Sequence, residues 1–218
     1  MEAPKNASWS FKYLLKIRPE ITPILVGLVQ EVSTSYIWDK LRPPAPKVPW
    51  HHMVWFSGRI SKHSIIVWMA LLNRLPTRVR LLRMGLAIET DKCLLCGEEA
   101  ENRDHLFFEC QFARDLWGSI LNLCCISREG CSWESELAWA TLLFKGKSLI
   151  VVVLKLAWSG HIYGIWNEKN GRLFENRVRS NDELLGDIKE TIRIRLLGKV
   201  FNRLDLVNNA LCANWGIA

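Results

Sequence analysis

The chain is 218 residues long, 49% of them apolar, and carries a formal net charge of +7 at pH 7. This length and composition predict a globular protein with a sizeable core, and they exclude a disordered chain or a small domain that folds only around a metal. The positive charge favours a polyanionic partner such as nucleic acid, although solubility alone accounts for a charge of this size.

Residues 1–46 are expected to form an irregular, shortened lead-in with a short helix at 9–17, because prolines at 19, 23, 43, 44, 46 and 49 break any longer helix. The first twenty residues contain an early acid and no long apolar core, so they are not a secretory signal. The seven cysteines follow no disulfide-like framework. We therefore expect an intracellular protein, nuclear or cytoplasmic, that is not secreted.

A helix is predicted over 61–75, where SKHSIIVWMALLNRL is apolar on almost every face in its centre. Such a helix is expected to be packed on several sides and to act as the hub of the core. Pro76 ends it, and Thr77 is expected to cap a short basic helix over 78–84 that ends at Gly85.

An amphipathic helix is predicted from about Asp104 to Leu123. Its apolar face would comprise Leu106, Phe107, Cys110, Ala113, Trp117, Ile120 and Leu121. Later helices are expected at 135–144, at 148–167 and at 181–197, where Ser180 and Glu183 form a capping-box pattern. The run at 150–153 is also compatible with a strand. The stretch 149–166 is apolar enough to suggest a membrane-spanning helix, but Lys155 interrupts this stretch, which favours a buried helix.

Four residues have the spacing of a zinc site: Cys93-x2-Cys96-x8-His105-x4-Cys110. Three thiolates and one imidazole complete a tetrahedron around zinc with no open position for water, which argues for a structural ion and against metal-assisted hydrolysis. Residues five apart in an α-helix point roughly 140° away from each other. His105 and Cys110 therefore require a distorted first turn, or a helix that begins between them. The alternative is a set of ordinary buried cysteines and a surface histidine.

The sequence around these ligands, KVPWHHMVWFSGRISKHSIIVWMALLNRLPTRVRLLRMGLAIETDKCLLCGEEAENRDHLFFECQFARDLWGSIL, resembles the zinc-binding domain that follows the reverse transcriptase in plant non-LTR retrotransposon polyproteins. The resemblance covers 47–123 closely, and HIYGIWNEKNGRLFEN and LCANWGIA resemble the tail of such polyproteins. It implies that Cys93, Cys96, His105 and Cys110 bind one structural zinc ion. It also implies a helical segment ahead of the knuckle, with Trp68 and Leu72 in the core and Thr77 as its cap.

The resulting expectation is a mainly α protein, with a small Cys-Cys-His-Cys zinc knuckle inserted between helices. Its predicted parts are the lead-in 1–46, a helical zinc-binding domain 47–125 and a helical C-terminal region 126–218. No aspartate pair of a polymerase and no carboxylate set of a ribonuclease H is recognisable, so we expect no catalytic residues and no small-molecule substrate.

The leading functional hypothesis is a non-catalytic module that binds RNA or DNA through basic residues between 59 and 92 and makes no membrane contact. The candidate nucleic-acid contacts are Lys62, Arg74, Arg78, Arg80 and Arg83. A second basic strip comprises Lys189, Arg193, Arg195, Lys199 and Arg203. The alternatives are solvated helix faces, a protein-interaction or scaffold module that uses exposed tryptophans and the acidic knuckle, and a retroelement remnant without a selected function.

Overall fold

The structure is a computed structural model that describes residues 15–20, 22–23, 36, 39–40, 46–130, 132–200 and 205–217. It divides into two compact units, Met1–Lys47 and Val48–Ala218. In the first unit residues 15–20 are helical, whereas most of the helix expected at 9–17 falls outside the described residues. The second unit contains the metal ligands.

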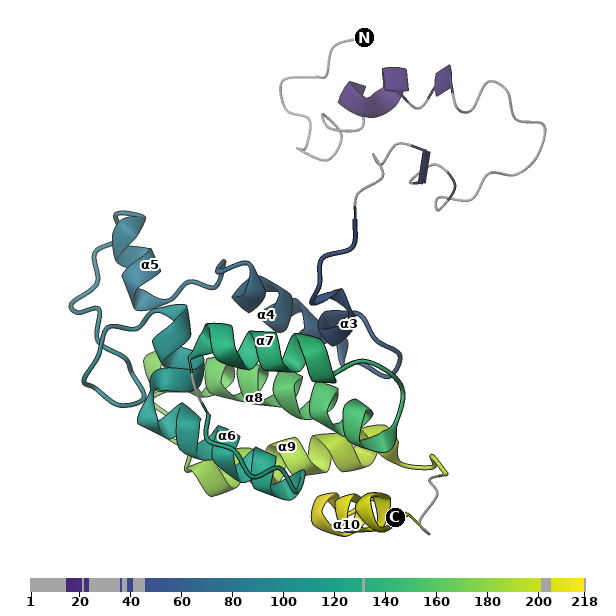
Figure 1. Cartoon of the computed structure of the whole chain (residues 1–218). Coiled ribbons are helices and arrows are strands. Elements are labelled where there is room, and N and C mark those ends of the chain that lie inside the picture. Colours follow the sequence, from purple (N-terminus) through teal and green to yellow (C-terminus); the bar gives the residue numbers. More distant parts are fainter. Residues whose placement is uncertain are drawn as a thin grey trace. The chain divides into compact units, whose positions relative to one another are not determined.

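The regular elements in the described part of the second unit are helices joined by loops, with one antiparallel bridge between Lys92 and Ala100 (Figure 1). The mainly α fold predicted from the sequence is therefore confirmed. The elements are α3 His51–Val54, α4 Ser61–Leu71, α5 Arg78–Arg83, the π-helical turn η1 His105–Glu109, α6 Gln111–Leu123, α7 Trp133–Leu143, α8 Leu149–Phe174, α9 Asn181–Leu196 and α10 Leu206–Trp215.

The helices predicted from periodicity are present with small shifts of their ends. The helix expected at 148–167 continues to Phe174, and the possible strand at 150–153 is part of it. The capping box of α9 is formed: the Ser180 hydroxyl accepts from Glu183 N, and the Glu183 carboxylate accepts from Ser180 N. The short helix α3 and the C-terminal helix α10 were not predicted.

The hub of the core is α8, which packs against α4, α6, α9, α10 and η1. At its centre Trp158 is 1% exposed, and its ring lies 5.0 Å from Phe108 and 5.5 Å from Trp117. By length and composition α8 could cross a membrane, but 78% of its most apolar window is buried inside the protein. This burial fits the expected core helix.

The prediction that the 61–75 helix is packed on several sides was wrong. Helix α4 buries the face that carries His63, Ser64, Val67 and Ala70, at the i, i+3, i+4 spacing of a single stripe. Trp68 and Leu72, which the resemblance placed in the core, are 41% and 43% exposed. Helix α4 has apolar residues on all its faces. One face is buried in the core, and another apolar face remains exposed.

Helix α5 begins without the expected side-chain cap, although Thr77 occupies the N-cap position. Glu101 takes the role instead: its carboxylate accepts from Arg78 N at 3.1 Å, and its backbone carbonyl accepts from Val79 N at 3.2 Å. These bonds satisfy two of the free N–H groups at the start of the helix. Helix α5 ends, as predicted, just before Gly85, whose φ of +80° is left-handed.

Candidate metal centre

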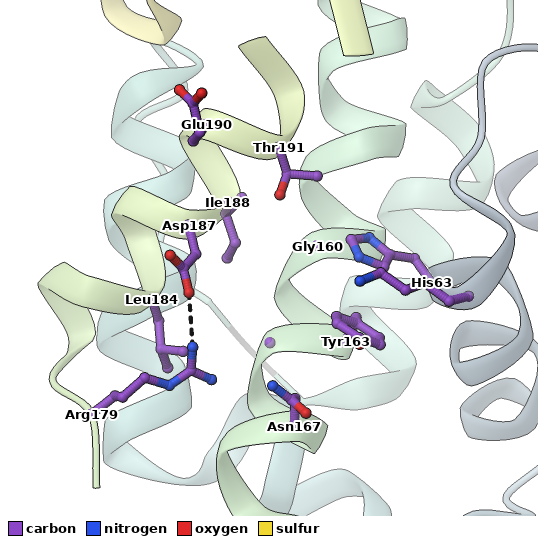
Figure 2. Close-up of a pocket in the computed structure, with 12 residues that line it drawn as sticks. His63, Gly160, Tyr163, Asn167, Arg179, Leu184, Asp187, Ile188, Glu190 and Thr191 are labelled. Carbon is purple, nitrogen blue, oxygen red and sulfur yellow. Dashed lines mark hydrogen bonds and ion pairs between the residues drawn. The ribbon is translucent and has the colours of Figure 1, made fainter. Parts of the chain in front are cut away.

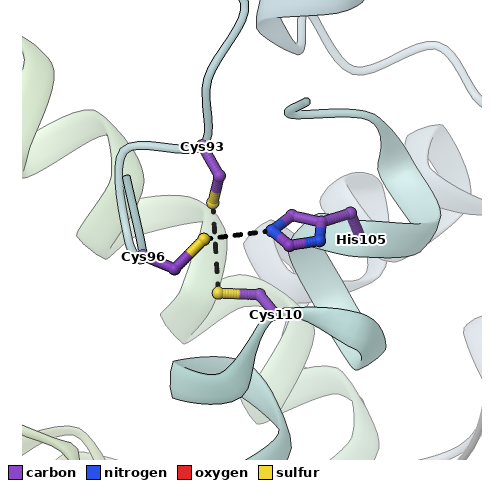
Figure 3. Close-up of side chains that lie close together, drawn as sticks. All are labelled: Cys93, Cys96, His105 and Cys110. Atoms are coloured by element: carbon purple, nitrogen blue, oxygen red, sulfur yellow. Dashed lines mark hydrogen bonds between the residues drawn. The ribbon is translucent and has the colours of Figure 1, made fainter. Parts of the chain in front are cut away.

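The four predicted metal ligands converge on one point (Figure 3). Their ligand atoms all lie within 4.8 Å of one another. Cys93 Sγ lies 4.0 Å from Cys110 Sγ, and Cys96 Sγ lies 3.3 Å from His105 Nε2. Cys93, His105 and Cys110 are buried and Cys96 is half-buried. Cys93 and Cys96 lie in the knuckle loop, and His105 and Cys110 lie in the segment leading into α6.

The knuckle is a tight turn that aims two sulfurs inward. Gly97, with a φ of +78°, donates its N–H to the Cys93 carbonyl at 2.8 Å, and Leu95 N lies 3.4 Å from Cys93 Sγ. The turn is closed behind the ligands by Cys93 N, which donates to Glu99 O at 2.7 Å. Backbone N–H groups directed at sulfur favour the thiolate form, which is the form that binds metal.

His105 and Cys110 face the same point because the chain between them is a π-helical turn. Cys110 N donates to His105 O at 2.7 Å, a bond that spans five residues instead of the four of an α-helix. Cys110 itself is extended, with φ −60° and ψ 130°, and α6 starts at the next residue. The distorted first turn required by the five-residue spacing is therefore present.

The donor set fits a tetrahedral metal ion. Zinc with Zn–S bonds of about 2.3 Å holds two sulfur ligands roughly 3.8 Å apart, close to the Cys93–Cys110 distance of 4.0 Å. Three sulfurs and one imidazole are the ligands preferred by zinc. The four residues can thus hold a metal ion without rearrangement of the backbone.

The contact between the two buried thiols shifts their pKa values in opposite directions. A hydrogen bond to Cys110 and burial raise the pKa of Cys93, while the same bond lowers the pKa of Cys110. A thiol must lose its proton to bind a metal ion, so metal binding here would release the proton of Cys93. Burial lowers the pKa of His105, which keeps the imidazole neutral as a ligand must be.

Two cationic side chains from α8 hold the knuckle from behind. One guanidinium nitrogen of Arg172 donates hydrogen bonds to Leu94 O at 3.1 Å and to Leu95 O at 3.0 Å. Lys169 Nζ lies 3.6 Å from Glu101 Oε1, and both side chains are almost completely buried. The second oxygen of Glu101 accepts from Leu94 N at 3.4 Å. The backbone between Cys93 and Cys96 is therefore fixed on both its N–H and its C=O side.

A third contact from α8 reaches the π-helical turn. The ring of His161 is buried, and its Nε2 lies 2.8 Å from the carbonyl oxygen of Phe107. A π-turn leaves carbonyls without their usual α-helical partner, and this histidine supplies one. The ring also stacks on Phe108 at 5.3 Å.

None of Glu101, His161, Lys169 and Arg172 was predicted as part of the site. Glu101 belongs to the acidic stretch of the knuckle, yet it is 0% exposed. The sequence signal that could have identified these supporting residues was the presence of charged side chains within the apolar run of α8. Charged and polar residues among buried neighbours require partners. The rest of the knuckle surface is acidic as expected, since Glu98, Glu99 and Glu109 border the same pocket as Cys96 and His105.

The five predicted nucleic-acid contacts do not form one surface. Arg80 and Arg83 line a cleft of about 170 Å³ together with Arg103. Arg74 is exposed in the turn that precedes α5. Arg78 is buried and donates to Thr90 O at 2.6 Å, so its charge is used inside the fold.

Lys62 lies in a different pocket, between α4, α8 and α9 (Figure 2). Its Nζ is 5.0 Å from the ring centre of Tyr163, which in turn stacks on His63 at 4.2 Å. This pocket also contains Asp187 and Glu190, and an ion pair joins Arg179 to Asp187. The acidic residues make it a poor site for a phosphate.

Comparison with known families agrees with the geometry. Residues 32–117 match the family described as zinc-binding in reverse transcriptase, and this range includes all four ligands. The match ends before α7, so the residues of α8 that support the knuckle lie outside it. No curated protein and no solved structure matches the chain.

Proposed function

Because residues 32–117 are a zinc-binding domain of the reverse-transcriptase family, and not its catalytic polymerase domain, we propose that the chain binds one structural zinc ion and a nucleic acid. Zinc would be held by Cys93, Cys96, His105 and Cys110, with no coordination position left for a substrate. It would fix the knuckle and the start of α6 and take no part in chemistry. We place this function inside the cell, in the nucleus or the cytoplasm.

Metal content tests the zinc site directly. Purified wild-type protein should contain one zinc per chain, and Cys93→Ser should contain none, because three ligands seldom hold structural zinc. A Cys125→Ser variant is the matched control, since Cys125 is exposed and is not one of the four ligands. A folded wild-type protein without zinc would refute the site.

The observation that supports nucleic-acid binding is the cleft of Arg80, Arg83 and Arg103 next to the exposed Arg74. Arginine guanidinium groups form paired hydrogen bonds with phosphate oxygens. Arg103 already bonds Asp104 and stacks on Trp133 at 4.5 Å, so it is fixed in place, whereas no ion pair of Arg80 or Arg83 is present among the described residues. Arg80 also donates from Nη1 to Asn73 O at 3.0 Å, so its remaining N–H groups and those of the exposed Arg83 are the ones offered to a phosphate.

A salt titration of oligonucleotide binding tests this part. Arg80→Gln/Arg83→Gln should weaken binding and reduce the salt slope by about two, one for each lost phosphate contact. Lys189→Gln/Arg193→Gln on α9 removes the same charge elsewhere and should change the slope less. Wild-type binding without salt dependence, or no binding at all, would contradict the proposal.

The exposed apolar residues of α4 favour a second function, a protein-interaction module. Ile65, Trp68 and Leu72 are 41–50% exposed, and Trp55 lies beside Trp68. Large apolar side chains grouped on one surface are typical of binding sites. If the wild type binds nucleic acid and the Arg80→Gln/Arg83→Gln variant does not, the result would favour the first function.

A further inference from the structure

A second pocket in the 48–218 unit has the chemistry of an anion site. It contains none of the five candidate nucleic-acid contacts, and one of its residues, Lys199, belongs to the second basic strip. It has a volume of about 550 Å³ and is formed by the α3–α4 loop, the loop before α8, α8 itself and the segment after α9. We call it the lysine pocket and define it by His52, Trp55, Phe56, Lys147, Lys155 and Lys199. No acidic residue is present among the described residues that line it.

Lys155 is the unusual member of the pocket because it is a buried cation without a carboxylate. It is 6% exposed, and its Nζ donates to Gly146 O at 3.3 Å. No ion pair of Lys155 occurs among the residues that the structure describes. Burial lowers its pKa, and no acid opposes that shift. Buried charges are normally paired, so this ammonium group lacks an anion.

The surroundings of Lys155 add positive charge instead of balancing it. Lys147 and Lys199 are exposed at the rim of the pocket. The pKa of His52 is lowered by burial and then by Lys155, His51 and Lys145, all of them basic residues. His52 Nε2 is buried and has no hydrogen-bond partner in the described part of the chain. A phosphate in this pocket would meet three ammonium groups and one unsatisfied ring nitrogen.

Aromatic rings stand next to these cations. Trp55 lines the pocket and is 48% exposed, with Trp68 at 6.5 Å between ring centres and the Arg59 guanidinium 5.5 Å above its ring. Phe56 forms the inner wall, and its ring centre is 5.7 Å from Lys155 Nζ. An exposed ring beside a cationic pocket is the arrangement by which proteins hold a base and its phosphate in a single strand.

The pocket is built into the fold and is not an accident of flexible side chains. Arg195 of α9 donates to Gly58 O at 2.6 Å and to Arg59 O at 3.0 Å, which fixes the loop that carries Trp55 and Phe56. Gly58 has a φ of +87°, and a Cβ at this position would lie 3.6 Å from Lys199 Nζ. The loop and the end of α9 thus approach each other closely at the rim.

We propose that the lysine pocket binds one nucleotide of a single-stranded nucleic acid, with the phosphate among Lys147, Lys155 and Lys199 and the base against Trp55. The inference rests on the proposed function and adds a contact that prefers unpaired strands. A duplex keeps its bases stacked on each other, so it cannot offer one to Trp55. Helices α3 and α5 lie at opposite ends of α4 (Figure 1), and the loop that carries Trp55 and Phe56 connects α3 to α4.

Fluorescence anisotropy with a labelled oligothymidylate of about 12 nucleotides and with a duplex of the same length tests the inference. Lys147→Gln/Lys199→Gln should weaken single-strand binding about tenfold at moderate salt and reduce the salt slope by about two. Trp55→Ala should weaken it about fivefold or more, with little effect on the duplex. All three side chains are exposed, so the variants should fold, which thermal unfolding checks.

The controls separate this inference from the proposed function. Lys189→Gln/Arg193→Gln should bind nearly as the wild type does. If Arg80→Gln/Arg83→Gln weakens binding while the pocket variants do not, the lysine pocket is refuted and nucleic-acid binding stands. If the wild type binds neither probe, both proposals fail. Equal losses for single strand and duplex in Trp55→Ala would also overturn the assignment of a base to this ring.

Discussion

The ring of His161 is buried at the centre of α8, with Nε2 hydrogen-bonded to Phe107 O and with no partner for Nδ1 among the residues that the structure describes. Burial lowers the pKa of His161 to about 4, from 6.5 in an unfolded chain. The unfolded state therefore takes up a proton at a higher pH than the folded state does. The stability that depends on neutral His161 is complete above pH 6.5 and is lost as the pH falls towards 4.

We expect acidification from pH 7.5 to pH 5 to lower the free energy of unfolding by about 2 kcal/mol through His161 alone. Urea unfolding at the two pH values measures the loss. His161→Gln should be less stable at pH 7.5 but should lose less on acidification, because Gln does not titrate.

The metal ligands also take up protons in acid. Comparing the pH dependence of the unfolding free energy between His161→Gln and the wild type cancels their contribution, because it is the same in both proteins. His51→Gln, at a histidine that is neither buried nor bonded inside the core, should retain the full wild-type loss. An identical pH slope in His161→Gln and the wild type would show that this residue does not control the acid sensitivity.

At the scale of elements, the last turns of α8 act as a support for the knuckle. Arg172→Ala removes the donor to Leu94 O and Leu95 O. Groups that orient metal ligands from behind typically change metal affinity by 10–100-fold when lost. We therefore expect Arg172→Ala to bind zinc about tenfold more weakly in a competition titration with a chromophoric chelator.

Arg193→Ala is the matched control, since Arg193 forms an exposed ion pair with Glu190 on α9. Exposed pairs of this kind contribute little to stability. Its zinc affinity should equal that of the wild type. Equal affinities in Arg172→Ala and the wild type would mean that the knuckle holds its shape without α8.

The elements also show what periodicity can and cannot predict. The spacing of apolar residues gave the buried face of α6 correctly, since Leu121, Ile120 and Trp117 are all 0% exposed. Helices α4 and α8 both have apolar centres. Their local sequence patterns do not indicate which of the two is surrounded by the remaining helices. That choice depends on α6, α9 and α10, which pack on α8 from distant parts of the chain.

The grouping of Cys93, Cys96, His105 and Cys110 was predictable because their spacing is local and their chemistry is specific. The supporting contacts were not, because Lys169 lies 68 residues after Glu101 and Arg172 lies 77 residues after Leu95. From sequence alone, a carboxylate in an acidic stretch is expected to be solvent-exposed, because its buried partner is not known. Sequence reasoning thus predicted the cluster of four candidate ligands but not the residues that hold it in place.

For the whole molecule, these contacts predict that residues 47–125 do not fold alone. That fragment contains every metal ligand but lacks Trp158, His161 and Arg172, which cover and tie the knuckle and η1. We expect the fragment to show low helicity and no cooperative unfolding by circular dichroism, even with added zinc. Mixing it with residues 126–218 should restore helicity.

The full chain is the reference for that experiment and should unfold in one cooperative transition for residues 48–218, which form a single compact unit. A sharp unfolding transition of the isolated 47–125 fragment would contradict the prediction. It would also show that α8 adds stability to a domain that is already complete.

The π-helical turn between His105 and Cys110 has a consequence for how this chain tolerates insertions. One extra residue in an α-helix rotates everything after it by about 100° and would turn the apolar face of α6 towards solvent. A π-turn absorbs the extra residue locally, so the downstream helix keeps its orientation. The number of residues between His105 and Cys110 therefore sets the local helical pitch, and loss of one residue there would convert the π-turn to an α-helical turn with a four-residue spacing between the two side chains.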